Sequence, residues 1–188
     1  GAVPTLLPGG RPVTDAAARA EVEQAWNLPA GTLPSAPGRD TDEILAAAAS
    51  GEIAALVVGG VDPYDLADPE AALAALRDAG FVVSLEMHTS AVTELADVVL
   101  PVAPDAQRAG SYLNWEGRRR EFGPALDASG VLPDCRVLDT LAVEMDVDLF
   151  TQTPAAAAGE LGRLGRWAGP APAGPKLPAG EPLRPAYG

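Results

Sequence analysis

The sequence has 188 residues, 47% of them hydrophobic, with a formal net charge of −13 and a pI near 4.3. This length allows one domain with a hydrophobic core, while the acidity argues against nucleic-acid binding and against docking on an anionic membrane. Cys135 is the only cysteine and His88 the only histidine, so we expect no disulfide, iron–sulfur site or ordinary zinc site within this chain. We also expect no signal peptide and no direct membrane insertion.

In chain order, the first predicted element is a helix that starts at Thr14 or Asp15 and runs to about Trp26. Segment 27–40 contains three prolines and two glycines, which exclude a helix or a central strand. A second helix is predicted from Asp40 to Gly51, because Asp40 and Glu43 form a capping-box pattern.

The most regular part of the sequence lies between residues 53 and 102. The run IAALVVGG (53–60) is typical of a strand that is buried on both faces, and FVVSLEM (81–87) and DVVLPV (97–102) predict two further strands. A helix from Asp68 to Gly80 and a short helix over 88–96 separate them. This β-α-β-α-β order predicts an α/β fold, a Rossmann-like parallel sheet with flanking helices.

The sequence after residue 130 predicts two helices and a tail. Asp134 is predicted to cap a helix with one apolar face, made by Val137, Leu138, Leu141 and Met145. A short amphipathic helix is expected around Glu160–Trp167, and a Pro/Gly-rich C-terminal tail over Trp167–Gly188. We therefore expect an α/β domain over residues 1–150, followed by a short helix and tail over 151–188.

Candidate site residues follow the predicted strands, because ligands of open parallel sheets bind beyond the carboxyl ends of the strands. Gly59, Gly60 and Asp62 follow the first strand, and Glu86 and His88 follow the second. The glycines either admit a phosphate or only turn the chain, and their spacing matches neither G-x-G-x-x-G nor a P-loop. Glu86 and His88 are candidates for an acid–base pair, but no nucleophile or metal partner is visible, so no catalytic residue is assigned.

Two further features allow both a functional and a structural interpretation. The arginines at 118–120 could hold a phosphate, but pairing of Arg118 with Glu116 on a solvated face is the favoured interpretation, and Trp115 could anchor a protein interface. Cys135, in the first turn of its helix, is either a thiol with a lowered pKa or, in the favoured interpretation, a packed small apolar residue.

Several motifs together resemble the molybdopterin oxidoreductase superfamily. They are ALVVGGVDP (55–63), TELADVVLP (93–101), GSYLNWEGR (110–118) and LPDCRVLDTLAVEM (132–145), in which Cys135 replaces the usual Trp. The resemblance covers about Gly51 to Met145. Within the superfamily, the chain is most similar to the large iron–sulfur subunits of bacterial respiratory NADH–quinone oxidoreductases.

The resemblance implies a fragment of such a subunit, serving as a scaffold in the peripheral electron-transfer arm without a redox centre of its own. It implies iron–sulfur clusters in the parent subunit, loss of molybdopterin, other peripheral-arm subunits as partners, and a cytoplasmic position on the plasma membrane. It also implies that Asn114, Glu116, Gly117 and Arg118 form the far wall of a vestigial pterin-nucleotide pocket, with Gly59, Gly60, Asp62 and His88 at the sheet.

Two alternatives remain at this point. The chain could be the C-terminal half of a true molybdopterin-dependent oxidoreductase of the formate dehydrogenase or nitrate reductase type, contacting a pterin guanine dinucleotide. It could also be an unrelated nucleotide-binding or adaptor domain with a doubly wound sheet.

Overall fold

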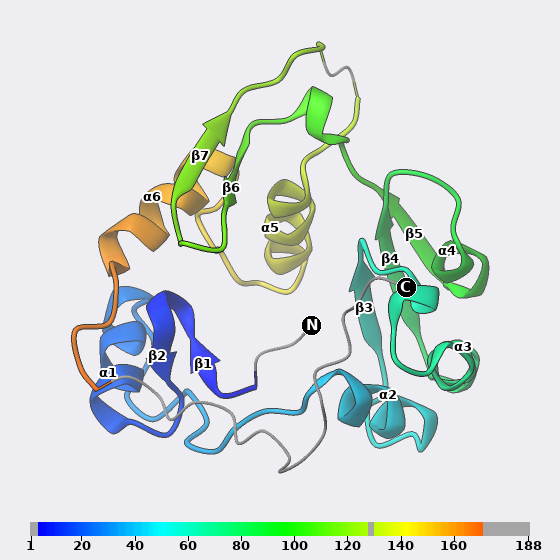
Figure 1. The fold of residues 1–188 in the computed structure, drawn as a ribbon, viewed down its shortest axis with the longest axis horizontal. Helices are drawn as coiled ribbons and strands as arrows, with labels where there is room; N and C mark the ends of the chain where they lie inside the picture. The colour runs from blue at the N-terminus through cyan, green and yellow to red at the C-terminus, as the bar shows by residue number, and fades with distance from the viewer. Residues whose placement is uncertain (1–3, 128–129, 171–188) are drawn as a thin grey trace.

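The computed structural model describes residues 4–127 and 130–170, and in these ranges the chain forms six α-helices and three small β-sheets (Figure 1). The helices are α1 (Ala16–Ala25), α2 (Thr41–Ala49), α3 (Pro69–Asp78), α4 (Ala91–Leu95), α5 (Asp134–Glu144) and α6 (Pro154–Leu164). The strands are β1 (Leu6–Leu7), β2 (Arg11–Pro12), β3 (Leu56–Gly59), β4 (Val82–Glu86), β5 (Val98–Pro101), β6 (Gly110–Leu113) and β7 (Arg119–Phe122).

The central sheet has the predicted parallel arrangement. Its order is β3-β4-β5, with Val57 beside Val83 and Val83 beside Val98. Helix α3 connects β3 to β4 and helix α4 connects β4 to β5, so the predicted β-α-β-α-β order is confirmed. All three carboxyl ends therefore lie at one edge, which is where the sequence placed the candidate site.

Local caps start the first three helices where the sequence predicted. Asp15 accepts hydrogen bonds from the backbone N–H groups of the first turn of α1, and Asp68 does so for α3. Asp40 and Glu43 form the complete capping box that opens α2. The prediction for α5 was wrong in detail: Pro133 is the N-cap, and Asp134 is the first helical residue without a capping hydrogen bond.

Different helices cover the two faces of the central sheet. On one face, Leu56 and Val82 pack with buried residues of α2, α3 and α4, among them Ala48, Leu76 and Val92. Figure 1 shows α3 and α4 on this side and α5 on the other. The second core is smaller and joins Leu85 of β4 to Val102 and to Val137 of α5.

The expectation that 53–60 forms a strand buried on both faces was wrong. The strand contains only Leu56–Gly59, and the side chain of Val57 is 60% exposed. The reason is that β3 is an edge strand, and the core on its second face reaches Leu85 and Leu100 without including Val57. The apolar run in the sequence indicated the strand but could not indicate how far α5 extends over it.

An antiparallel hairpin, β6–β7, lies in a region for which the sequence predicted neither a helix nor a strand. Tyr112 and Phe122 stack across it with ring centroids 5.0 Å apart. The hairpin belongs to an excursion between residues 103 and 131, and both ends of this excursion meet where Val102 pairs with Leu132. A hydrogen bond of 2.9 Å from the N–H of Ala103 to the carbonyl of Leu132 closes it.

Helix α6 begins earlier than expected and packs against the N-terminal part of the chain. Thr153 caps it and Leu164 ends it, whereas the sequence suggested Glu160–Trp167. Its neighbours are α1 and the 3-10 helix η1 (Pro8–Gly10). The predicted division at residue 150 stays a prediction, and most of the expected tail, residues 171–188, lies outside the described residues.

The apolar face predicted for α5 is only partly used. Val137 is buried and Leu141 packs beside it, but Leu138 and Met145 are exposed. The 3.6-residue period identified the helix correctly, yet the partners available to α5 in this chain cover only a narrow stripe of it.

Candidate functional site

A pocket of about 390 Å³ lies at the carboxyl edge of the parallel sheet. Gly60, Asp62 and His88 line it, as predicted, and Glu86 at the end of β4 lines it as well. Gly59 is the last residue of β3, and Gly60 turns the chain with a φ of 61°, a conformation that favours glycine. The sequence thus placed four of its candidates correctly at one edge.

Some polar side chains of this pocket already have hydrogen-bond partners in the chain, whereas Glu86 has none among the described residues. Asp62 accepts a hydrogen bond of 3.0 Å from the N–H of Tyr64 and so caps the 3-10 helix η2 (Pro63–Asp65). Ser90 and Thr93 form a reciprocal cap at the start of α4. Glu86 is only 7% exposed, and its carboxylate has no hydrogen bond or ion pair with any residue that the structure describes.

The proposed acid–base pair is not formed. His88 is exposed in the loop after β4, and no hydrogen bond joins it to Glu86 among the described residues. The described chain also lacks any group of three His, Cys, Asp or Glu residues placed to hold a metal ion. What the described residues of this pocket offer is hydrogen-bond acceptors, the carboxylates of Asp62 and Glu86.

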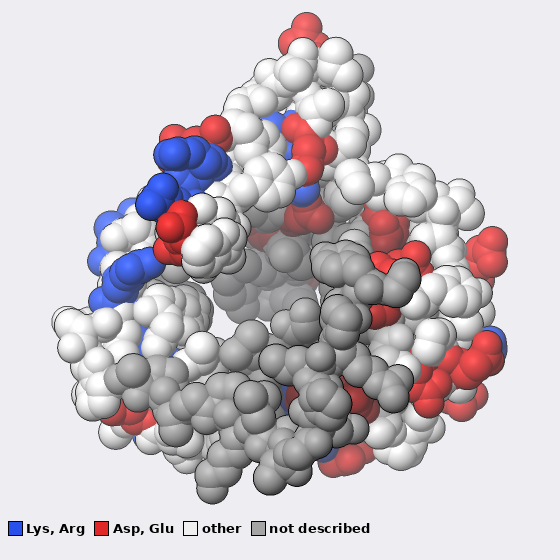
Figure 2. Space-filling model, in the orientation of Figure 1, with Lys and Arg blue, Asp and Glu red and all other residues white. Residues whose placement is uncertain are grey.

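The charge around this pocket does not fit the pyrophosphate of a pterin dinucleotide. Two carboxylates line it, from Asp62 and Glu86, and no arginine or lysine is found among its described lining residues. Figure 2 shows acidic side chains gathered over the half of the molecule that holds the sheet, and the basic ones mainly on the opposite side. Like charges at short range would repel a bound diphosphate, whereas phosphate sites are lined by donors and cations.

The second predicted group of residues forms the turn of the β6–β7 hairpin. The side-chain oxygen of Asn114 accepts hydrogen bonds from the N–H groups of Glu116 (3.1 Å) and Arg118 (2.8 Å). Gly117 has a φ of 75°, and its N–H donates to the carbonyl of Asn114. Arg118 pairs with Glu116 at 3.3 Å, as expected, and both are exposed, so these residues hold the turn.

The two predicted groups are not brought together. The turn of the hairpin lies away from the carboxyl edge of the sheet in Figure 1, and none of its four predicted residues lines the pocket beside Glu86. Local motifs identified each group, but the sequence carried no information on the distance between them. A single pocket built from all eight residues is therefore not what the chain forms.

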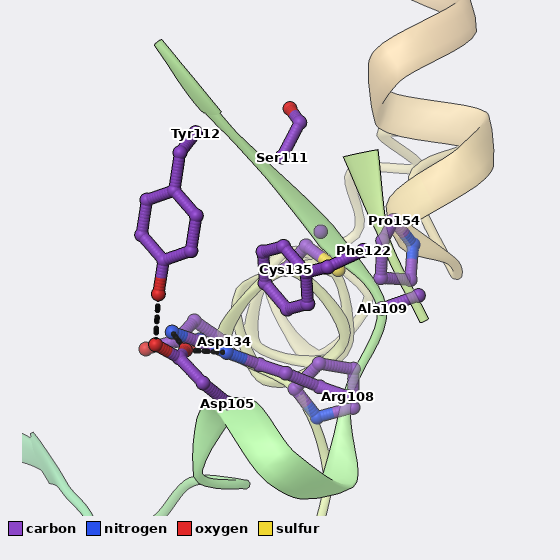
Figure 3. A pocket seen from close by; sticks show the side chains of 11 residues that line it. Asp105, Arg108, Ala109, Ser111, Tyr112, Phe122, Asp134, Cys135 and Pro154 are labelled. Atoms are coloured by element: carbon purple, nitrogen blue, oxygen red, sulfur yellow. Dashed lines mark hydrogen bonds and ion pairs between the residues drawn. The ribbon is translucent and has the colours of Figure 1, made fainter. Parts of the chain in front are cut away.

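A third cluster, which the sequence analysis missed, lies between the hairpin and the start of α5 (Figure 3). Arg108 donates to Asp105 at 2.9 Å and also pairs with Asp134, while the hydroxyl of Tyr112 donates to Asp105. The hydrogen bonds from Tyr112 and Arg108 lower the pKa of Asp105. The hydrogen bond between Tyr112 and Asp105 also raises the pKa of the Tyr112 hydroxyl. These charged groups are paired with one another, so the cluster has a structural role: it holds the segment before the hairpin against the start of α5.

Cys135 faces the small cavity beside this cluster, with the ring of Phe122 nearby (Figure 3). Desolvation by its surroundings raises the pKa of the thiol. This direction supports the interpretation of Cys135 as a packed apolar residue and opposes an activated thiol.

The comparisons with known proteins define the class of protein. Residues 10–132 match the family model of molybdopterin oxidoreductases, and this chain belongs to that family. It is 56% identical over 191 aligned residues to the G subunit of NADH-quinone oxidoreductase from Mycobacterium tuberculosis, covering 100% of this chain and 23% of the relative. The corresponding G subunit of Streptomyces coelicolor is 51% identical, over 99% of this chain and 22% of the relative.

The chain thus spans about a quarter of the length of these curated relatives. Relatives named as nitrate reductases are more distant: one from Symbiobacterium thermophilum is 33% identical over 76% of this chain and 19% of the relative. The resemblance seen in the motifs at 55–63, 93–101 and 110–118 is therefore confirmed for the family. In the described part of the chain, no helix has the length and apolar character needed to cross a membrane.

Proposed function

We propose that this chain is a structural domain of the G subunit of an NADH–quinone oxidoreductase, and that it acts as a scaffold in the peripheral arm without a redox centre of its own. The observation that carries the proposal is the 51–56% identity to such G subunits along the whole chain. Two features support a structural role. The polar groups of the hairpin turn at Asn114 bond to one another, and Arg108 forms ion pairs with Asp105 and Asp134.

In this proposal the parent enzyme passes electrons from NADH to quinone, and iron–sulfur clusters sit in other parts of the parent subunit. One cysteine in 188 residues cannot supply the set of thiolates that a cluster usually needs. Its partners are then other subunits of the peripheral arm, and it lies on the cytoplasmic face of the plasma membrane.

A second candidate, a molybdopterin-dependent oxidoreductase, rests on the family match and on relatives such as the periplasmic nitrate reductase of Desulfovibrio desulfuricans, 33% identical over 77% of this chain. The acidic lining of the pocket at Glu86 opposes it, because it does not suit a pterin diphosphate. Under the first candidate, Gly59, Gly60, Asp62 and His88 are proposed to be the vestige of a pterin-nucleotide pocket, whereas the second candidate requires a pocket that still binds the pterin. The third possibility, an unrelated nucleotide-binding domain, has no support from the family match.

The test uses the full-length protein that contains this chain, with an affinity tag, purified from its native host. The expected result is co-purification with NADH:quinone reductase activity and with iron, but without molybdenum or a fluorescent pterin on denaturation. A stoichiometric amount of molybdenum and pterin would establish the second candidate instead. Absence of the tagged protein from the reductase complex would refute the scaffold proposal.

A further inference from the structure

Glu86 is a buried charged residue whose carboxylate has no partner among the described residues. The other buried charged side chains, Arg11, Glu23 and Asp139, all take part in hydrogen bonds. The Glu86 carboxylate lines the pocket rather than being sealed in the interior, since among the described residues the buried side-chain atom without a hydrogen-bond partner is Oγ of Ser84. A cation that enters the pocket would pair with this carboxylate in surroundings of lower dielectric than bulk water, which strengthens the attraction. Since the pocket beside Glu86 has a volume of about 390 Å³, it has room for such a group.

The chain itself does not provide that cation within its described parts. From Asp40 to Pro101 the sequence carries twelve acidic residues and a single arginine or lysine, Arg77. Arg77 is exposed near the end of α3 and does not line the pocket, whereas Asp62 adds a second carboxylate to the lining. The local field therefore attracts a positive group from outside and repels an anionic one.

The rim of the pocket is apolar and exposed. Val61, Tyr64 and Met87 line it, and Tyr64 and Met87 are 64% and 54% exposed. Tyrosine and methionine are enriched at protein interfaces, and an aromatic face also attracts a guanidinium group. An arginine side chain matches both features, because its stem packs on apolar surface while its planar head bonds a carboxylate.

We propose that the pocket formed by Asp62, Glu86 and the rim of Val61, Tyr64 and Met87 is the docking site for an arginine side chain of another subunit. This inference rests on the proposed function, and it names the residues through which the scaffold domain would contact a neighbouring subunit. Glu86 is the buried anchor that pairs with the guanidinium, Asp62 adds negative potential, and the rim excludes water from the pair.

The experiment compares Glu86→Gln with a matched control, Glu94→Gln, in the full-length subunit within its complex. Glu94 lies on α4 in the same acidic region, is exposed, and does not line the pocket. The measured quantity is the rate at which the subunit dissociates from the purified complex at fixed ionic strength. We expect Glu86→Gln to dissociate at least tenfold faster than wild type, and Glu94→Gln to stay within twofold.

Urea unfolding of the free full-length subunit separates binding from folding. Because Glu86 has no partner in the described chain, Glu86→Gln should leave the unfolding midpoint of the free subunit unchanged or raise it. A lower midpoint would place the partner within the same polypeptide and overturn the intersubunit assignment. The variant Glu86→Asp, which keeps the charge but shortens the side chain, should restore part of the retention.

Two small-molecule probes test whether the pocket binds a positively or a negatively charged group. Agmatine, a small guanidinium compound, should compete with the partner and speed dissociation of the wild-type subunit more than sodium chloride of equal ionic strength. A rise in melting temperature with guanosine diphosphate that is lost in Glu86→Gln would overturn the inference, because the pocket would then bind an anion. Equal dissociation of the two glutamine variants overturns it too, while failure of the wild-type subunit to join the complex refutes the proposed function itself.

Discussion

Replacing Arg11 by alanine should destabilise the chain, because this one side chain joins the N-terminal segment to the end of α6. Arg11 is 2% exposed and donates to the carbonyls of Leu164 and Gly165, both at 2.9 Å. It also pairs with Glu21 at 2.8 Å, and its guanidinium lies 5.9 Å from the ring centroid of Trp167. The positive charge therefore sits at the C-terminus of a helix, where it is favourable.

The magnitude follows from the bonds that are lost. Each charge-assisted hydrogen bond contributes about 1.5–3 kcal/mol, and water can replace part of the two bonds to the carbonyls of α6 after truncation. We expect Arg11→Ala to lower the free energy of unfolding by about 3 kcal/mol, or to lower the melting temperature by roughly 6–12 °C for a chain of this size. Arg11→Lys should recover less than half, because an ammonium group cannot donate in a planar fork.

Urea unfolding of the chain followed by far-UV circular dichroism measures this change, and hydrogen exchange of the α6 amides locates it. The matched control is Arg77→Ala, which removes an exposed arginine from α3 and should change stability by less than about 0.5 kcal/mol. A loss smaller than about 1 kcal/mol for Arg11→Ala, or unchanged exchange in α6, would refute the reasoning that Arg11 holds the two segments together.

Three further changes test other features. Gly117→Ala should destabilise by about 1 kcal/mol in urea melts, because its φ of 75° strains a residue with a side chain, whereas Gly123→Ala, with open space around it, should not. Hydrogen bonds from the N–H groups of Leu33 and Gly31 lower the pKa of Glu23, so its stabilising contribution is present above the unfolded-state pKa and is lost as the pH falls through the lowered folded-state value. The melting temperature of wild type should therefore fall more steeply with decreasing pH than that of Glu23→Gln. Parallel plots of melting temperature against pH would contradict this. Because burial raises the pKa of the Cys135 thiol, iodoacetamide should alkylate the folded chain at about pH 7.5 more slowly than the urea-unfolded chain, and equal rates would show an accessible thiolate.

The helices that the sequence predicted best are those with local start signals. Asp15, Asp40 and Asp68 each accept hydrogen bonds from N–H groups within three residues, so the signal and the structure lie in the same short segment. The parallel order of β3, β4 and β5 was also predictable, because each crossover passes through one helix.

Long-range packing was not predictable in the same way. The exposure of Val57 depends on where α5 ends over the sheet, and the contact of Arg11 with Gly165 spans 154 positions along the chain. At the candidate site, the loops after the strands were located correctly, but the hairpin turn at Asn114 lies elsewhere. The unpartnered state of Glu86 depends on which side chains fail to reach it, and a sequence pattern does not contain that information.

The closed excursion between residues 103 and 131 has a consequence for how this fold tolerates change. Because Val102 and Leu132 are paired, the chain leaves and returns within one strand spacing, about 4.8 Å. The far end of this segment, the β6–β7 turn, can be lengthened or shortened while the bridge and the Arg108–Asp134 ion pair keep β5 and α5 in place. Beyond the bridge at Val102, the segment can therefore differ in length and surface shape between proteins that share the same central sheet.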